Sequence, residues 1–233
     1  MTHPDSPEFD AYADDYDDVV RRGLSVSGES RDFFARRRVD HVRRSLDGRV
    51  VGRILDFGCG DGATSLLLAA AFPDADVVGS DVSPRSIARA RAVHSAERIR
   101  FLTGQELAQL ADWRADVVYT NGVFHHIRPP DRNVAFQQIL GVLARDGTLA
   151  LWENNPWNPG ARIVMRRIPF DRDAIPLSPR VAWRLVHAQG LTVQRTDFLF
   201  YFPRALAFLR RTEPLFRRLP FGAQYCVLCT RSS

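Results

Sequence analysis

The amino-acid sequence predicts an α/β fold in which helices cover both faces of a doubly wound, mostly parallel sheet. Short apolar segments rich in β-branched residues alternate with longer segments whose apolar residues recur at helical spacing, which is the pattern of successive βαβ units. The apolar segment 53–57 also runs directly into a glycine-rich loop, residues 58–62, which is followed by a helical segment. Because open α/β sheets bind nucleotides at the carboxyl ends of their strands, the same region predicts a ligand site.

The predicted elements follow one another with short connections. Two helices come first, one over residues 8 to about 20 and one that is capped by Ser30 or Asp32 and ends near residue 46. Proline at the first turn of a helix, as at Pro84, removes an N–H group that has no helical partner there. The core strands are predicted at residues 53–57, 75–80, 98–102, 115–120 and 148–152, and the core helices at 63–72, 84–94 and 131–143.

The C-terminal third has a different organisation. Residues 154–179 are rich in Pro, Asn and Arg and are predicted to cover the site as a loop or short helix. A helix at 179–189, a strand at 191–200, an amphipathic segment at 203–219 and a last strand at 224–230 are predicted after it.

Length and composition fit one domain of ordinary enzyme size. The chain has 233 residues, of which 45% are hydrophobic, which is enough for a packed core. No apolar run reaches the ~18 residues of a membrane span, and the N-terminus lacks a signal-peptide pattern, so we expect a cytoplasmic protein without a membrane span. Three cysteines do not form a disulfide framework, and Cys226 and Cys229 should face opposite sides of a strand.

The positive charge of the chain comes from arginine alone, because the sequence has no lysine. The net charge is +5, with acidic residues at 10–18 ahead of arginines at 36–44 and a second basic cluster at 210–218. These clusters indicate either solvated helix faces or attraction of an anionic partner. A nucleic-acid enzyme usually carries a dedicated recognition module, and none is visible in the sequence.

The glycine-rich loop is the most informative motif. Glycine allows a ligand to approach the backbone where a side chain would block it. Asp56, at the end of the preceding strand, can accept hydrogen bonds from a cationic or hydroxylated ligand. Gly58, Gly60 and Ala63 also fit the dinucleotide fingerprint G-x-G-x-x-G/A, so the loop alone does not decide between ligands.

The pattern Asp-x-Gly-x-Gly-x-Gly resembles the first motif of class I S-adenosylmethionine (SAM)-dependent methyltransferases. The resemblance covers about residues 53–152 and the last two strands. It implies a seven-stranded, mostly parallel sheet whose antiparallel last strand lies between strands five and six, and SAM as the cofactor, with S-adenosylhomocysteine as the product. It further implies a single domain with a helical lid (1–48), a SAM-binding core (49–153), a small cap after strand five (154–180) and a C-terminal part (181–233).

The resemblance assigns cofactor contacts to the ends of the strands. Asp81 would hold the ribose hydroxyls, as it would in an NAD site, and Gln105 or Glu106 would contact the adenine. In similar enzymes a tyrosine of the entry helix closes over the methionine part, a role that favours Tyr16 over Tyr12 unless both simply pack the helix. The predicted cofactor contacts are Tyr16, Arg38, Asp56, Gly58, Cys59, Gly60, Asp81, Val82, Gln105, Glu106 and Asn121.

Arg38 is included because its guanidinium could pair with the SAM carboxylate in a bidentate fork. Arg36 and Arg37 precede it and point in other directions on a helix, so the sequence leaves the choice among the three arginines open.

Methyl transfer is a direct displacement, so the protein must align the acceptor at ~3 Å from the methyl group and, for a phenol or enol, remove a proton. His125 and His126 follow Asn121 closely, and one of them is predicted to be the base, unless the pair only shapes the pocket. The predicted acceptor contacts are Tyr12, Asn154, Asn155, Trp157 and Phe170. Asp171 and Asp173, next to Phe170 in the covering segment, are expected to line the same pocket.

For Asn154, Asn155 and Trp157 the alternative role is structural turn capping. Likewise, the aromatic cluster at residues 198–202 either forms a wall for an aromatic acceptor or packs a strand end.

The sequence therefore favours a SAM-dependent methyltransferase of a small-molecule acceptor, from secondary metabolism or from lipid or quinone modification, with the methylated atom open. We expect no metal site, no nucleic-acid partner, and a monomer or homodimer. The alternatives are a SAM-binding enzyme that does not methylate, such as a cyclase, an RNA methyltransferase, or an NAD-dependent oxidoreductase.

Overall fold

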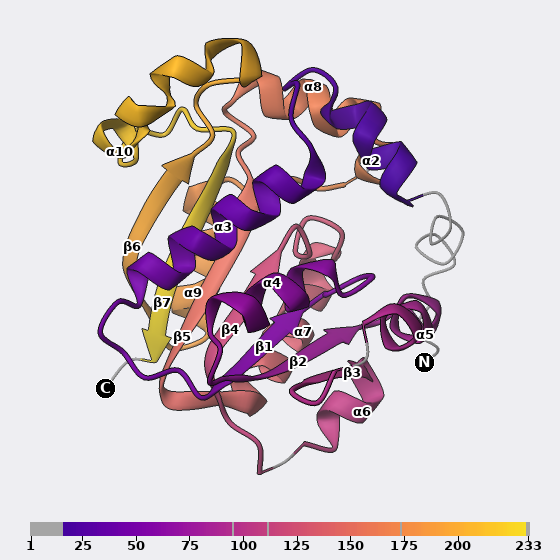
Figure 1. The fold of residues 1–233 in the computed structure, drawn as a ribbon. Helices are drawn as coiled ribbons and strands as arrows, with labels where there is room; N and C mark the ends of the chain where they lie inside the picture. The colour runs from indigo at the N-terminus through magenta and orange to yellow at the C-terminus, as the bar shows by residue number, and fades with distance from the viewer. Residues whose placement is uncertain (1–15, 95, 111, 173, 232–233) are drawn as a thin grey trace.

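The computed structural model describes residues 16–231 apart from 95, 111 and 173, and side chains from residue 19 onward. Seven strands form one sheet in the order β3-β2-β1-β4-β5-β7-β6 (Figure 1). Strand β7 is antiparallel to both of its neighbours, and every other pair is parallel. The strands are β1 Arg53–Phe57, β2 Asp76–Asp81, β3 Ile99–Thr103, β4 Ala115–Asn121, β5 Leu143–Asn154, β6 Leu191–Leu199 and β7 Gln224–Arg231. The predicted sheet and the position of its antiparallel strand are confirmed.

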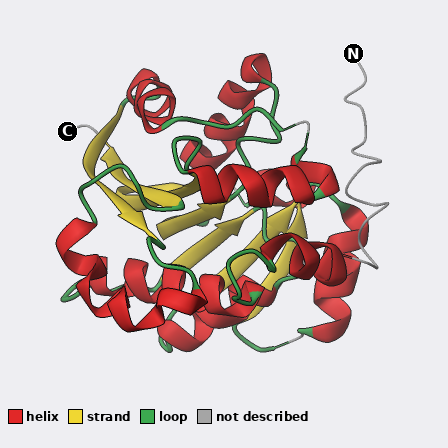
Figure 2. Ribbon diagram, turned by 90° about the horizontal axis from the view of Figure 1, so that it is seen from above, coloured by secondary structure: helices red, strands yellow, loops and turns green. Residues whose placement is uncertain are grey.

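Helices cover both faces of the sheet, as the view along its edge shows (Figure 2). One face packs against α3 Arg31–Ser45, α4 Ala63–Ala71 and α5 Pro84–Val93, and the other against α6 Gly104–Ala108, α7 Arg132–Val142 and α9 Pro179–Ala188. Successive side chains of each strand point to opposite faces of the sheet, so each strand contributes to both cores: Ile54 packs in the core beneath α3, α4 and α5, and Leu55 in the core beneath α6, α7 and α9. The same alternation puts Cys226 and Cys229 in opposite cores, as predicted.

Local capping explains where the helices begin. The hydroxyl of Ser30 accepts from the Phe33 N–H at the start of α3, and the hydroxyl of Ser83 accepts from the Ser86 N–H at the start of α5. Asn158 caps α8 Pro159–Arg167 in the same way. The covering segment after β5 thus contains a helix of two turns, which the sequence analysis left open between a loop and a short helix.

Some boundaries differ from the prediction. The first described helix, α2 Tyr16–Leu24, continues past the predicted break at Gly23, and α6 was not predicted. Strand β6 ends at Leu199 because Phe200 adopts a left-handed conformation with φ 64°.

The remaining elements gather above the carboxyl ends of the strands. Helix α2 packs against α8 and η2 Pro169–Asp171, while η3 Arg204–Thr212 and α10 Glu213–Phe216 lie beyond the end of β6 (Figure 1). Another short helix, η1 Pro129–Asp131, leads into α7. None of the described helices has the length and hydropathy needed to cross a membrane.

Candidate functional site

The glycine-rich loop lies at the carboxyl end of β1, next to β2 and β4. Gly58, Gly60 and Gly62 have φ angles of +77°, +55° and +83°, a conformation that favours glycine. A Cβ on Gly58 would lie 2.2 Å from Val123 Cγ2, so packing alone requires glycine there. A Cβ on Gly60 would meet nothing within 4 Å. The backbone at Gly60 therefore faces open space, which fits the close approach of a ligand.

Asp81 connects the end of β2 to this loop. Its Oδ2 accepts from the Gly60 N–H at 2.9 Å, and its Oδ1 accepts from the Ser83 N–H at 2.9 Å. The carboxylate is partly exposed, so it can meet a ligand at the loop while it holds the loop backbone.

Asp56 lies beneath the loop rather than at its surface. It is 2% exposed, and its Oδ2 accepts from the Ser65 hydroxyl at 2.7 Å. Burial raises the pKa of Asp56 to about 7; the hydrogen bond from Ser65 opposes this, and the charges of Asp81 and Asp61 add to it. In the structure Asp56 therefore connects the end of β1 to α4 through its hydrogen bond with Ser65.

A contact that the sequence analysis did not anticipate joins the loop to the N-terminal helices. Arg31, in the first turn of α3, donates from both terminal nitrogens to the two oxygens of Asp61, each at 2.7 Å. The pair is partly buried. The sequence gives little indication of this pair, because Arg31 is one of many arginines and lies 30 positions from Asp61.

The other predicted cofactor contacts lie in different surroundings. Cys59 is buried, Val82 is 68% exposed and Gln105 is exposed. Glu106 accepts from the Thr103 N–H in the capping box of α6 and pairs with Arg91. Of the predicted tyrosines, Tyr12 and the side chain of Tyr16 lie outside the described part of the chain.

Arg38 is buried where α3 crosses the sheet. It donates from Nε to the Tyr119 hydroxyl at 3.1 Å and from Nη1 to Gln224 Oε1 at 3.0 Å. Its neighbours in the basic cluster serve other pairs: Arg36 with Asp32, at the surface, and Arg37 with Glu213. Among the three, Arg38 is the one that borders the pocket described next.

A pocket of about 330 Å³ lies above the carboxyl ends of β4 and β5 and the amino end of the antiparallel β7. Helices α2, α3 and α8 form its walls, together with the segment that follows β6. Aromatic rings line much of it, and Asn121 and Gly122 border it where β4 ends. The lining rings are Phe33, Phe34, Phe170, Phe200, Tyr201 and Phe202.

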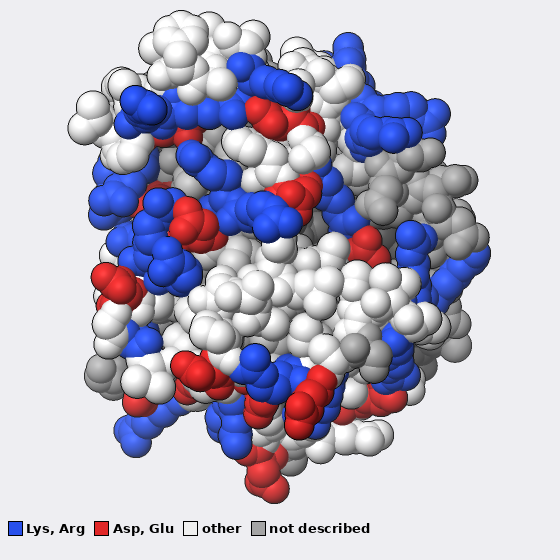
Figure 3. Space-filling view, in the orientation of Figure 1, with Lys and Arg blue, Asp and Glu red and all other residues white. Residues whose placement is uncertain are grey.

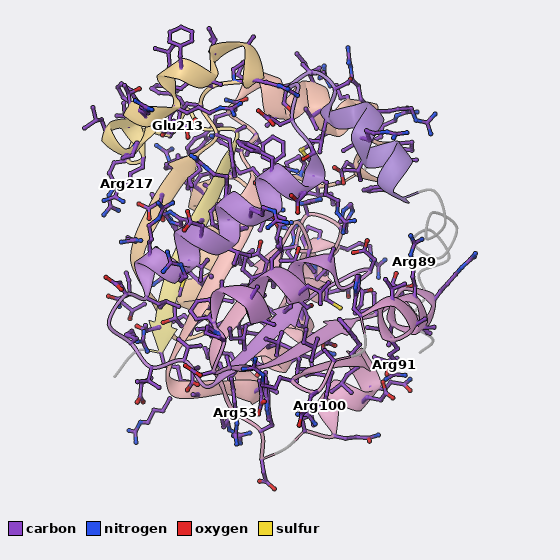
Figure 4. All side chains as sticks on the ribbon, in the orientation of Figure 1. Arg53, Arg89, Arg91, Arg100, Glu213 and Arg217 are labelled. Atoms are coloured by element: carbon purple, nitrogen blue, oxygen red, sulfur yellow. The ribbon has the colours of Figure 1, made fainter. Side chains whose placement is uncertain are left out.

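Ion pairs support the far wall of the pocket. Glu213 is buried and accepts from the Tyr201 and Phe202 N–H groups through Oε1, while Oε2 meets Arg37 at 2.9 Å. Figure 4 shows Glu213 between α10 and α3, whereas Arg217 points outward from the same segment. Arg210 pairs with Glu29 at 2.8 Å and stacks over the Phe33 ring.

Two histidines and an aspartate form the polar end of the pocket. His125 is 3% exposed, and its Nδ1 lies 2.6 Å from Glu153 Oε2. The Nε2 atoms of His125 and His126 lie 3.4 Å and 3.2 Å from the same oxygen of Asp171. Burial lowers the pKa of His125, but Glu153 and Asp171 outweigh it and raise the pKa to about 10. The sequence analysis expected Asp171 to line the pocket, but not to meet the two histidines. Asp173 lies outside the described residues.

The backbone holds this cluster together. The Ile175 N–H donates to the His125 carbonyl at 2.8 Å, which ties the segment after Asp171 to the loop after β4. Arg132, which is buried, donates to the Phe124 and Ile127 carbonyls on either side of the histidines and to the Ile175 carbonyl.

The predicted acceptor contacts divide into two groups. Asn154 and Phe170 line the pocket. Asn155 is fully buried and donates to the Pro220 and Gly222 carbonyls, so it fastens the turn before β7. Trp157 is 46% exposed and does not line the pocket.

Charge on the outer face of α3 is mixed. Figure 3 shows basic and acidic side chains interspersed over this helix. Arg43 and Arg44 pair with Asp40, and Arg36 pairs with Asp32, within one or two turns of the same helix. Such pairs are typical of a solvated helix face.

Parts of the sequence are similar to those of known proteins. Residues 54–147 match the family model described as a methyltransferase domain. The chain is 31% identical over 166 residues to trans-aconitate 2-methyltransferase of Klebsiella pneumoniae (strain 342). The aligned region covers 66% of this chain and 62% of that protein. The chain thus spans less than two thirds of the length of that curated relative.

Solved structures share the fold. A SAM-dependent methyltransferase from Archaeoglobus fulgidus superposes with a TM-score of 0.66 at 15% identity, over 87% of this chain and 95% of that one. Magnesium protoporphyrin IX methyltransferase from Synechocystis PCC 6803, with bound SAM, superposes with a TM-score of 0.62 at 21% identity, over 100% of this chain and 99% of that one. In its strand order and its glycine loop the chain has the class I SAM-dependent methyltransferase fold, and its residues 54–147 match a methyltransferase domain.

Proposed function

We propose that the protein transfers a methyl group from SAM to a small molecule held in the pocket above β4 and β5. One observation carries this proposal: the pocket begins at Asn121 and Gly122, and the next residue, Val123, packs against Gly58 of the glycine loop. A donor at the loop and an acceptor in the pocket would therefore be neighbours.

The residues around the loop fit SAM. Gly60 leaves the space that a ligand needs, and Asp81 presents a carboxylate beside it that suits the ribose hydroxyls. Asn121 and Arg38 border the pocket on the side of the loop and would contact the methionine part. When bound, SAM supplies a methyl group that is already activated by its positively charged sulfur.

The protein's own task is to enclose and orient the acceptor. Helix α2 packs on α8 and η2 through Val19, Val20, Ile168 and Phe170, which supports a lid formed by residues 1–48 and a cap formed by residues 154–180 over a core at 49–153. The C-terminal part, 181–233, closes the far wall with Tyr201 and Phe202. Such enclosure excludes water and limits the size of the acceptor.

The histidine pair lies where the acceptor would lose a proton. Since Glu153 and Asp171 favour the protonated form of His125, His126 is the better candidate for a base; its side chain is 17% exposed and borders the pocket. An oxygen, nitrogen or carbon acceptor fits this arrangement equally well.

The first experiment is calorimetry of the purified protein with SAM and, separately, with NAD. We expect saturable SAM binding and none for NAD, because the space beyond the loop is an acceptor pocket of about 330 Å³ lined by aromatic rings. Binding of NAD without SAM would overturn the proposal and make the loop a pyrophosphate site.

The second experiment follows formation of S-adenosylhomocysteine with small acids, phenols and amines. trans-Aconitate belongs in the set because it appears in the name of the Klebsiella relative. Val164→Phe, which fills the pocket from α8, should reduce turnover and leave SAM affinity unchanged, whereas Ile163→Phe, on the exposed side of the same helix, should change neither. Turnover only with RNA, insensitive to Val164→Phe, would favour an RNA methyltransferase. Tight SAM binding without transfer to any acceptor would favour a non-methylating enzyme.

A further inference from the structure

Three side chains with metal-binding atoms meet at the polar end of the pocket. His125, His126 and Asp171 each offer one such atom, and these atoms all lie within 4.8 Å of one another. The histidines come from the loop after β4 and the aspartate from the end of η2, so the fold gathers them from two separate segments.

One of these atoms has no hydrogen-bond partner. Because Glu153 accepts from Nδ1 of His125, the opposite ring nitrogen, Nε2, is directed to the cluster, where it is buried and makes no hydrogen bond. A histidine that gives its Nδ1–H to a carboxylate and keeps Nε2 available has the arrangement found in metal-bound histidines. Glu153 is itself fixed by the Phe124 N–H at 2.9 Å.

The spacing suits coordination to a single ion. Metal–ligand bonds of ~2.0–2.2 Å separate neighbouring ligand atoms by about 2.8–3.6 Å, the shorter values at octahedral and the longer at tetrahedral angles. The two Nε2 atoms lie 3.2 Å and 3.4 Å from the shared oxygen of Asp171. The ligand atoms of the two histidines also lie within 4.8 Å of each other, and His126 borders the pocket.

We propose that His125, His126 and Asp171 bind one divalent first-row transition-metal ion at the polar end of the pocket. Two imidazoles and one carboxylate favour ions such as Zn²⁺ or Fe²⁺ over Mg²⁺ and Ca²⁺, which prefer oxygen ligands. Three protein ligands leave coordination positions free for an acceptor, as in catalytic zinc sites.

This inference deepens the proposed function and changes one part of it. A bound ion would displace the proton that Glu153 and Asp171 favour on His125, would make His126 a ligand and not a base, and would lower the pKa of an acceptor hydroxyl or water. Acceptors that chelate through two oxygens would then be preferred. The metal site itself does not depend on methyl transfer.

The test uses the full chain without a histidine tag, stripped with a chelator and titrated with Co²⁺ and with Zn²⁺. We expect one ion per chain by calorimetry and the visible absorption of four- or five-coordinate Co²⁺. Mg²⁺ in large excess should not displace it.

Four variants locate the site. Asp171→Asn and His126→Ala each remove a ligand and should abolish the Co²⁺ spectrum, while Glu153→Gln should weaken binding about 10–100-fold. His187→Ala, an exposed histidine of α9 far from the pocket in the fold, is the matched control and should bind as the wild type does. Thermal unfolding of each variant checks that it is folded.

Equal Co²⁺ affinity in the wild type, Asp171→Asn and His126→Ala would overturn the site, as would the absence of saturable binding in the wild type. SAM calorimetry on the same samples separates the two proposals. SAM binding without metal binding removes only the metal site, and metal binding without SAM binding removes only the proposed function.

Discussion

Arg31 and Asp61 form a two-pronged ion pair, with both nitrogen–oxygen distances at 2.7 Å, that ties the first turn of α3 to the glycine loop. Arg31 also lines the pocket. The pair therefore connects the N-terminal helices, the acceptor pocket and the loop that would hold SAM. Bidentate arginine–carboxylate pairs add geometric restraint as well as energy.

Removing this connection should loosen the loop. We expect Arg31→Ala to lower SAM affinity about tenfold, which corresponds to about 1.4 kcal/mol, near the lower limit of about 1.5 kcal/mol for hydrogen bonds to charged groups. Calorimetry with SAM measures the change. Arg36→Ala, which removes an exposed pair with Asp32 on the same helix, is the control and should bind SAM normally. Equal affinity in Arg31→Ala and the wild type would show that the loop holds its shape unaided.

Asp81 should matter both as a ligand and as a support. In Asp81→Asn the amide oxygen can still accept one hydrogen bond, but the amide nitrogen cannot accept the other, so Gly60 or Ser83 loses its partner. We expect SAM affinity to fall about 10–100-fold by calorimetry. Asp76→Asn, at the exposed start of the same strand, should have no effect. An undiminished affinity in Asp81→Asn would remove this carboxylate from the site.

The fold was predictable because its signals are local and repeated. Alternating strand and helix periods, the cap at Ser30 and the proline at Pro84 fix most core elements within a residue or two of their observed bounds, although β5 begins five residues before the predicted strand. The resemblance then supplied the strand order, which no local pattern contains. Boundaries such as the end of α2 depend on packing against α8 and could not be predicted in that way.

The site was predictable where a motif carries it and not where tertiary contacts do. The loop glycines, Asp81 and the histidine pair all follow strands. By contrast, Asp171 is held beside the histidines by tertiary contacts such as the hydrogen bond from the Ile175 N–H to the His125 carbonyl, which joins residues 50 positions apart. Asn155 was expected among acceptor contacts, but its amide meets the carbonyls before β7, which lie far away in sequence.

The pKa of Asp56 predicts a pH dependence of stability. Its pKa is about 7 in the folded protein, above the ordinary value of 3.8 for an aspartate, so between these values the unfolded chain loses a proton that the folded chain keeps. The contribution of Asp56 to stability therefore falls as pH rises from about 4 to about 7 and is constant above that. Asn at this position can still accept from Ser65 but cannot ionise.

We accordingly expect Asp56→Asn to gain stability relative to the wild type as pH rises through this window, by a few kcal/mol at most. Urea unfolding at pH 5, 6, 7 and 8 gives the free-energy difference at each pH. A difference that is constant with pH would mean that Asp56 ionises alike in both states. Asp76→Asn, at an exposed carboxyl on the neighbouring strand, serves as the control.

Gly60 allows the ligand role of the loop to be separated from its fold. Gly60 and Gly48 both have positive φ angles, +55° and +78°, and a Cβ on either would meet nothing within 4 Å. Alanine at each position should thus cost a similar ~1–2 kcal/mol of backbone strain, seen as a similar loss in the free energy of unfolding. Gly48 lies in the turn after α3, whereas Gly60 faces the space assigned to SAM. We therefore expect Gly60→Ala alone to lose SAM affinity in calorimetry, at least tenfold, because the new methyl group occupies part of that space. If both variants bind SAM as the wild type does, the ligand does not approach the loop at Gly60, and the cofactor site must lie elsewhere along the carboxyl edge of the sheet.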